Sequence, residues 1–85
     1  MKTFNYTIKD PMGIHARPAG LLVKAVKGMG CEITIGKEGK AVAADRLLSV
    51  MGLGIRNGDT VTVTVAGDGE DAAAKALKAF FEQNL

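Results

Sequence analysis

The 85-residue chain contains no tryptophan, a single cysteine and a single histidine. One cysteine cannot form an internal disulfide, so the chain suits a reducing compartment and we expect it in the cytoplasm. No apolar run is long enough to cross a membrane, and the first residues lack the apolar core of a signal peptide, so membrane insertion is not expected. The histidine, the cysteine and the scattered carboxylates show no metal-ligand spacing. We therefore expect neither a metal nor a cofactor.

The chain also has no large excess of charge of one sign, because its net charge is +2 and its acidic and basic residues are interspersed. A nucleic-acid-binding domain of this size needs a basic stripe or aromatic side chains on an exposed sheet face, and neither pattern is present. We therefore expect no nucleic-acid partner. A hydrophobic content of 47% is typical of a globular protein, and the length suits one domain, which we expect to span residues 1–85.

The hydrophobic pattern predicts seven elements. Period-two alternation predicts strands over residues 2–8, 31–35, about 40–44 and 60–65. Three- and four-residue spacing predicts helices over about 16–27, around 47–51 after a cap at Asp45, and from about residue 70 after a cap at Asp68 or a neighbour. The clear strands are apolar on one face only, which favours an antiparallel sheet with one face open to water. The fold class is therefore α+β, an open-faced two-layer sandwich of order βαββαβα with three helices on one side.

The same pattern predicts the core. Cys31 falls on the apolar side of the second strand and is expected to be a small buried side chain. In the last helix, Ala73, Ala76, Leu77 and Phe80 form the expected apolar stripe, with Phe81 only partly covered. The full predicted core consists of Phe4, Ile8, Leu22, Val26, Ile33, Ile35, Val61, Val63, Leu77 and Phe80.

The only histidine lies where a turn becomes a helix, in the segment Gly13-Ile14-His15-Ala16-Arg17-Pro18. Pro18 suits the first helical turn, so His15 is predicted at the N-cap or next to it. The amides of Ala16 and Arg17 have no carbonyl partner within the helix, and the helix dipole favours an anion there. Arg17 adds a guanidinium that can bind a phosphate or carboxylate. From these residues alone two interpretations remain open: a phosphoryl-accepting site, or a histidine that caps a helix beside a solvated arginine.

The segment from Gly13 to Ala19 closely resembles the active-site signature of the HPr family, the phosphocarriers of the phosphoenolpyruvate:sugar phosphotransferase system. The Gly39-Lys40 hairpin end, the segment from Met51 to Ile55, the length and the element order extend the resemblance over essentially the whole chain. The resemblance implies a phosphoryl carrier and not an enzyme with its own turnover. It also implies phosphorylation of His15 on Nδ1, with Arg17 and the backbone of Ala16 and Arg17 as phosphate ligands, and the strand order first, fourth, second, third.

The resemblance further implies the partners. Phosphorylated Enzyme I is the expected donor, IIA domains of sugar permeases are the expected acceptors, and a monomer is expected. The sequence leaves the apolar short helix equally open to burial and to docking, and the resemblance favours docking through the first helix and the short one. The expected docking residues are Gly20, Lys24, Arg46, Leu47, Leu48 and Met51. An alternative in the same family is a regulatory carrier of a nitrogen-related or dihydroxyacetone kinase phosphorelay, and His15 and Arg17 do not distinguish it.

Two positions depart from the family pattern. Arg46 stands where many members carry a regulatory serine, so regulation by phosphorylation there is not expected. Met12 stands where members often place a small polar residue beside the active centre. Because methionine cannot hydrogen-bond the imidazole comparably, either the histidine is oriented differently or a backbone group takes over.

Overall fold

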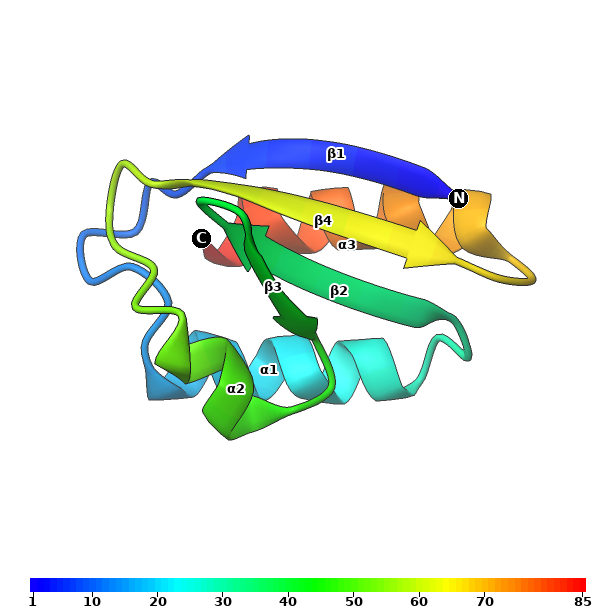
Figure 1. The fold of residues 1–85 in the computed structure, drawn as a ribbon, viewed down its shortest axis with the longest axis horizontal. Helices are drawn as coiled ribbons and strands as arrows, with labels where there is room; N and C mark the ends of the chain where they lie inside the picture. Colours follow the sequence, from blue (N-terminus) through cyan, green and yellow to red (C-terminus); the bar gives the residue numbers. More distant parts are fainter.

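The computed structural model describes all 85 residues, which form four strands and three helices in the order βαββαβα (Figure 1). This is the predicted order. The bounds are β1 Lys2–Thr7, α1 Ala16–Lys27, β2 Glu32–Lys37, β3 Lys40–Ala43, α2 Leu47–Gly52, β4 Thr60–Ala66 and α3 Glu70–Asn84.

The strands form one antiparallel sheet in the order β1-β4-β2-β3, which confirms the predicted fold class and strand order (Figure 1). The helix α3 packs against β1 and β4, and α2 packs against α1 and β3. Along β4 the side chains of Val61, Val63 and Val65 are buried, whereas those of Thr60 and Thr62 are exposed. On the threonine face, side chains form hydrogen bonds between strands, and the hydroxyls of Thr7 on β1 and Thr60 on β4 lie 2.9 Å apart. The alternation in the sequence thus gives the sheet one buried face, which the helices cover, and one face exposed to solvent.

Most of the predicted core is buried, but the last helix is rotated from the predicted orientation. Phe81 is fully buried, and Phe80 is only half-buried. The ring of Phe81 lies 6.0 Å from that of Phe4 and 5.5 Å from that of Tyr6, both on β1. The prediction that placed Phe80 inside was therefore wrong. The aromatic rings of the edge strand β1 pack against Phe81, the next residue of α3, and this contact turns Phe81 into the core. Phe4 is half-buried, since β1 has a neighbour on one side only. The core residues predicted correctly are Ile8, Leu22, Val26, Ile33, Ile35, Val61, Val63 and Leu77.

The prediction for Cys31 was also wrong, because Cys31 lies in a bend before β2 and is half-buried. Its thiol donates to the carbonyl of Asp68 in the β4–α3 loop, with the two atoms 3.1 Å apart. The bend follows Gly30, whose φ of +69° reverses the chain after α1. The thiol therefore binds a neighbouring loop, while the side chain packs only partly buried against the core.

The cap of the second helix differs from expectation, whereas the cap of the third helix falls within the prediction. The N-cap of α2 is Arg46, with extended backbone, and Asp45 lies exposed one residue earlier. The amide of Arg46 donates to the carbonyl of Ala43, so a turn that contains Asp45 separates β3 from the helix. The N-cap of α3 is Gly69, the neighbour of Asp68, in the left-handed conformation.

The turn before α1 depends on Gly13. Its φ is +67°, and a Cβ added there would collide with the Ile55 carbonyl oxygen and lie 2.6 Å from Cα of Arg56. The amide of Gly13 donates to the carbonyl of Asp10 at 2.9 Å, and the next amide, that of Ile14, donates to the carbonyl of Ile55 at 3.1 Å. Only glycine allows the turn to lie this close to the chain that follows α2.

We therefore expect Gly13→Ala to lower the free energy of unfolding by at least about 1–3 kcal/mol, because it adds both backbone strain and a steric clash. Gly20→Ala is the matched control, since Gly20 lies inside α1 with no atom within 4 Å of an added Cβ. That variant should raise stability by roughly 0.5–1 kcal/mol through helix propensity. Urea unfolding of the two variants measures the difference, and equal midpoints would contradict this account.

Candidate functional site

His15 is the N-cap residue of α1, as predicted. Its backbone is extended, with φ −102° and ψ −175°, and its carbonyl accepts the amide of Ala19 at 3.0 Å. Its side chain makes no capping hydrogen bond to the helix and is 34% exposed. The backbone of His15 is therefore fixed at the helix start, while its imidazole stays partly open to solvent.

The first turn of α1 presents positive partial charge to the surroundings of His15. The helix supplies no carbonyl for the amides of Ala16 and Arg17, and no acidic side chain lies in this turn. The basic residues of the last turn, Lys24 and Lys27, lie at the opposite end, where they suit the dipole. An anion at the helix start would therefore meet two free amides and no carboxylate from the helix itself.

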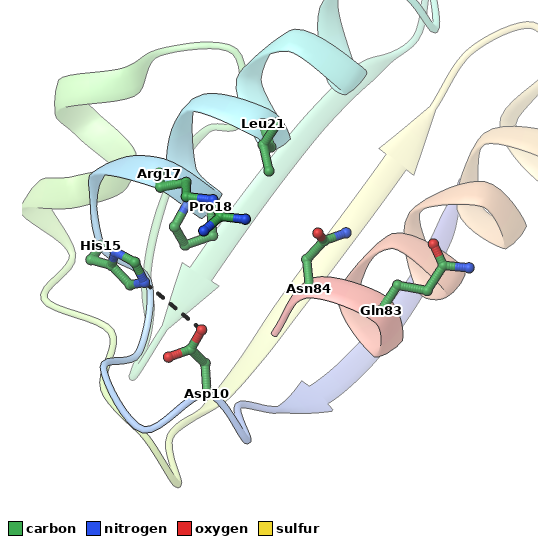
Figure 2. A pocket seen from close by; sticks show the side chains of 7 residues that line it. All are labelled: Asp10, His15, Arg17, Pro18, Leu21, Gln83 and Asn84. Carbon is green, nitrogen blue, oxygen red and sulfur yellow. Dashed lines mark ion pairs between the residues drawn. The ribbon is translucent and has the colours of Figure 1, made fainter.

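A depression of about 210 Å³ opens in front of the ring (Figure 2). It joins three parts of the chain: the loop after β1, the first half of α1 and the end of α3. Both His15 and Arg17, the predicted reactive and phosphate-binding side chains, line it. The residues that line it are Asp10, His15, Arg17, Pro18, Leu21, Gln83 and Asn84.

Asp10 lies in the loop between β1 and α1 and is a site residue that the sequence analysis did not name. Figure 2 shows its carboxylate directed at the His15 ring, with Oδ2 at 3.8 Å from Nε2. The other oxygen, Oδ1, accepts the amide of Met12 at 2.8 Å, and the amide of Asp10 donates to the carbonyl oxygen of Leu85 at 2.8 Å. The signal in the sequence was the spacing from Asp10 to Met12, since an aspartate often accepts the amide two residues later.

This arrangement also bears on the question that Met12 raised. The Met12 side chain is 71% exposed, and its backbone amide is bonded to Asp10. The group that faces the imidazole is therefore the carboxylate of Asp10, two residues before the position where a polar side chain was expected.

A second carboxylate, that of Asp59, stabilises the segment that contacts the turn before His15. Asp59 Oδ2 accepts hydrogen bonds from the ammonium of Lys37 at 2.7 Å and from the backbone amide of Arg56 at 2.8 Å. The ammonium of Lys37 also donates to the carbonyl of Gly54 at 3.1 Å. The hydrogen bond from Lys37, and then that from the Arg56 amide, lower the pKa of Asp59 below its ordinary value. These bonds fix the segment whose Ile55 carbonyl holds the amide of Ile14, next to His15.

The predicted docking residues lie outside the depression. The helix α2 buries Val50 and leaves Leu48 83% exposed. Leu47 and Met51, with Leu21 of α1, are the other exposed apolar side chains of the α1 and α2 surface. Arg46 and Lys24 are exposed, and Gly20 is half-buried. The structure thus leaves one side of the short helix uncovered, with basic side chains nearby.

Residues 2–83 match the family model PTS-HPr, described as the PTS HPr component phosphorylation site. The chain belongs to the HPr family. It is 43% identical over 77 residues to the phosphocarrier protein HPr of Lysinibacillus sphaericus, covering 91% of this chain and 88% of that protein. Family membership confirms the resemblance drawn from the sequence.

Solved HPr structures agree. The crystal structure of HPr-C-His from Thermoanaerobacter tengcongensis matches with a TM-score of 0.92 and 36% identity, over 98% of this chain and 93% of that one. An HPr dimer from the same organism matches with a TM-score of 0.76 and 36% identity, over 98% and 95%. The chain is thus a phosphocarrier of the phosphotransferase system and not a self-sufficient enzyme. No helix has the length and apolar character needed to span a membrane.

The lowered pKa of Asp59 gives a pH-dependent prediction. The folded-state pKa lies below the ordinary value near 3.8, so the carboxylate stabilises the fold above that pH and ceases to do so as the pH falls through the folded-state pKa. We expect Asp59→Asn to melt at a lower temperature than the parent at pH 7, and the difference to vanish in strong acid. Thermal unfolding between pH 7 and pH 2 measures it.

Asp45→Asn is the control, because Asp45 is an exposed carboxylate with no ion pair. It should melt like the parent throughout. A melting difference for Asp59→Asn that is the same at every pH would show that the side chain acts by shape and not by charge.

Proposed function

We propose that Nδ1 of His15 accepts a phosphoryl group from a donor protein and passes it to an acceptor. The lone pair of Nδ1 attacks phosphorus, and the bond to the donor breaks with its electron pair going to the donor. Transfer to the acceptor reverses these changes at Nδ1. The proposal rests on the position of the His15 ring. His15 is the N-cap residue of α1, but its side chain makes no hydrogen bond to the helix and remains one-third exposed.

Arg17 and the free amides of Ala16 and Arg17 would hold the phosphoryl oxygens. Phosphoryl transfer depends mainly on positioning and on stabilising charge, and the helix start offers both. The guanidinium lies in the same depression as the ring and is not engaged in an ion pair. A planar, permanently charged side chain there suits a dianion.

We further propose phosphorylated Enzyme I as the donor and IIA domains of sugar permeases as acceptors, with exchange in the cytoplasm. The docking surface is the exposed side of α2 with the adjoining part of α1, namely Gly20, Lys24, Arg46, Leu47, Leu48 and Met51. Exposed apolar side chains with basic neighbours support this assignment, because interfaces commonly combine an apolar centre with a polar rim.

A monomer fits this role, because a single site must meet two partners in succession.

The first test is intact-mass analysis after incubation with phosphoenolpyruvate and a catalytic amount of Enzyme I. The parent should gain one acid-labile phosphate, and His15→Ala should gain none, because the only imidazole is lost. An unmodified parent chain, or phosphate retained on His15→Ala, would refute His15 as the acceptor.

The second test concerns Arg17. Arg17→Ala should fold normally, since Arg17 is exposed, and should be phosphorylated roughly tenfold more slowly at saturating Enzyme I, because a charge-assisted contact to the phosphoryl group is lost. Rapid-quench kinetics measure the rate. Lys78→Ala removes an exposed cation from α3 as the control, and equal rates for the two variants would exclude a specific role for Arg17.

A further inference from the structure

Asp10 is the one carboxylate in the depression, and it is held at several points. Its amide, its carbonyl and its Oδ1 are each engaged, with Leu85, Gly13 and Met12 respectively. The side chain is 23% exposed, so it has little freedom to turn away. Of its polar atoms, Oδ2 alone has no hydrogen bond, and this oxygen lies 3.8 Å from Nε2 of His15 (Figure 2).

The consequence concerns the proton of a neutral imidazole, which lies on one ring nitrogen or the other. A carboxylate is only an acceptor, so a carboxylate facing Nε2 favours the tautomer with the proton on Nε2. The lone pair is then on Nδ1. Contacts of this kind are often long in the resting protein and shorten when the reaction begins.

The same contact acts during transfer. When Nδ1 bonds to phosphorus, its lone pair is used and the ring, which keeps its proton on Nε2, becomes positively charged. A carboxylate facing that N–H stabilises the charge. When the acceptor attacks phosphorus, the electron pair returns to Nδ1 and the ring is neutral again. The proton stays on Nε2 in both half-reactions, so no proton has to be exchanged with solvent.

We infer that Asp10 is a positioning residue that keeps the proton on Nε2 of His15, and so presents Nδ1 as the nucleophile. The inference rests on the proposed function of His15. It assigns to Asp10 the role of polar partner of the imidazole, which the side chain of Met12 cannot take in this chain.

Two variants separate the charge of Asp10 from its part in the turn. In Asp10→Asn the amide oxygen still accepts the Met12 amide, which leaves the NH₂ group facing the ring. That group is a donor, so it favours a bare Nε2 and a proton on Nδ1, the unreactive tautomer. In Asp10→Ser the hydroxyl keeps a turn acceptor and is too short to reach the ring. Asp71→Asn, on the far end of α3, is the control for loss of one negative charge.

The tautomer is read from the ¹⁵N chemical shifts of the imidazole in the unphosphorylated chain, and the transfer rate is read with Enzyme I. We expect the proportion of Nε2–H and the rate to fall in the order parent, Asp10→Ser, Asp10→Asn, with Asp10→Asn slower roughly tenfold and Asp71→Asn equal to the parent. Circular dichroism monitors folding of each variant.

A parent-like tautomer in Asp10→Asn would overturn the inference, as would an unchanged transfer rate in that variant. Because the tautomer is measured without phosphorylation, the two proposals fail separately. If the parent itself takes no phosphate while Asp10→Asn still inverts the tautomer, His15 is not the acceptor and Asp10 nevertheless controls its proton.

Discussion

The site depends on the close contact between the turn at Gly13 and the chain at Ile55 and Arg56. A Cβ at Gly13 would collide with that backbone, and the amide of Ile14 donates to the Ile55 carbonyl immediately before the histidine. This contact fixes where α1 begins. Because His15 is the first residue outside the helix, the start of α1 also fixes where the imidazole and the free amides meet.

Other interactions hold the two sides of this contact. Asp59 and Lys37 fix the segment that carries Ile55, and the carbonyl oxygen of Leu85 accepts the amides of Lys9 and Asp10 at 2.6 and 2.8 Å. The end of the chain thus lies against the loop that holds the Asp10 carboxylate. Residues from both ends of the sequence are therefore needed to shape a site whose chemistry comes from one short segment.

The local sequence pattern was sufficient to predict those elements whose structure depends on neighbouring residues in the chain. The alternation of valine and threonine in β4 and the proline in the first turn of α1 predicted the strand, the helix start and the N-cap at His15. The family resemblance added the strand order, which alternation cannot show. What the sequence could not show was set by tertiary contact: Phe81 is inside because β1 offers it Phe4 and Tyr6, and Cys31 binds the loop after β4. The sequence did not single out Asp10, because only the folded loop places its second oxygen near the ring.

We propose that phosphate is held at the start of α1, on Nδ1 of His15 and against the amides of Ala16 and Arg17. NMR of the ¹⁵N-labelled, phosphorylated chain tests this most directly. We expect a one-bond coupling between ³¹P and Nδ1, with the largest amide shifts at Ala16 and Arg17. Coupling to Nε2, or amide shifts concentrated away from the start of α1, would contradict it.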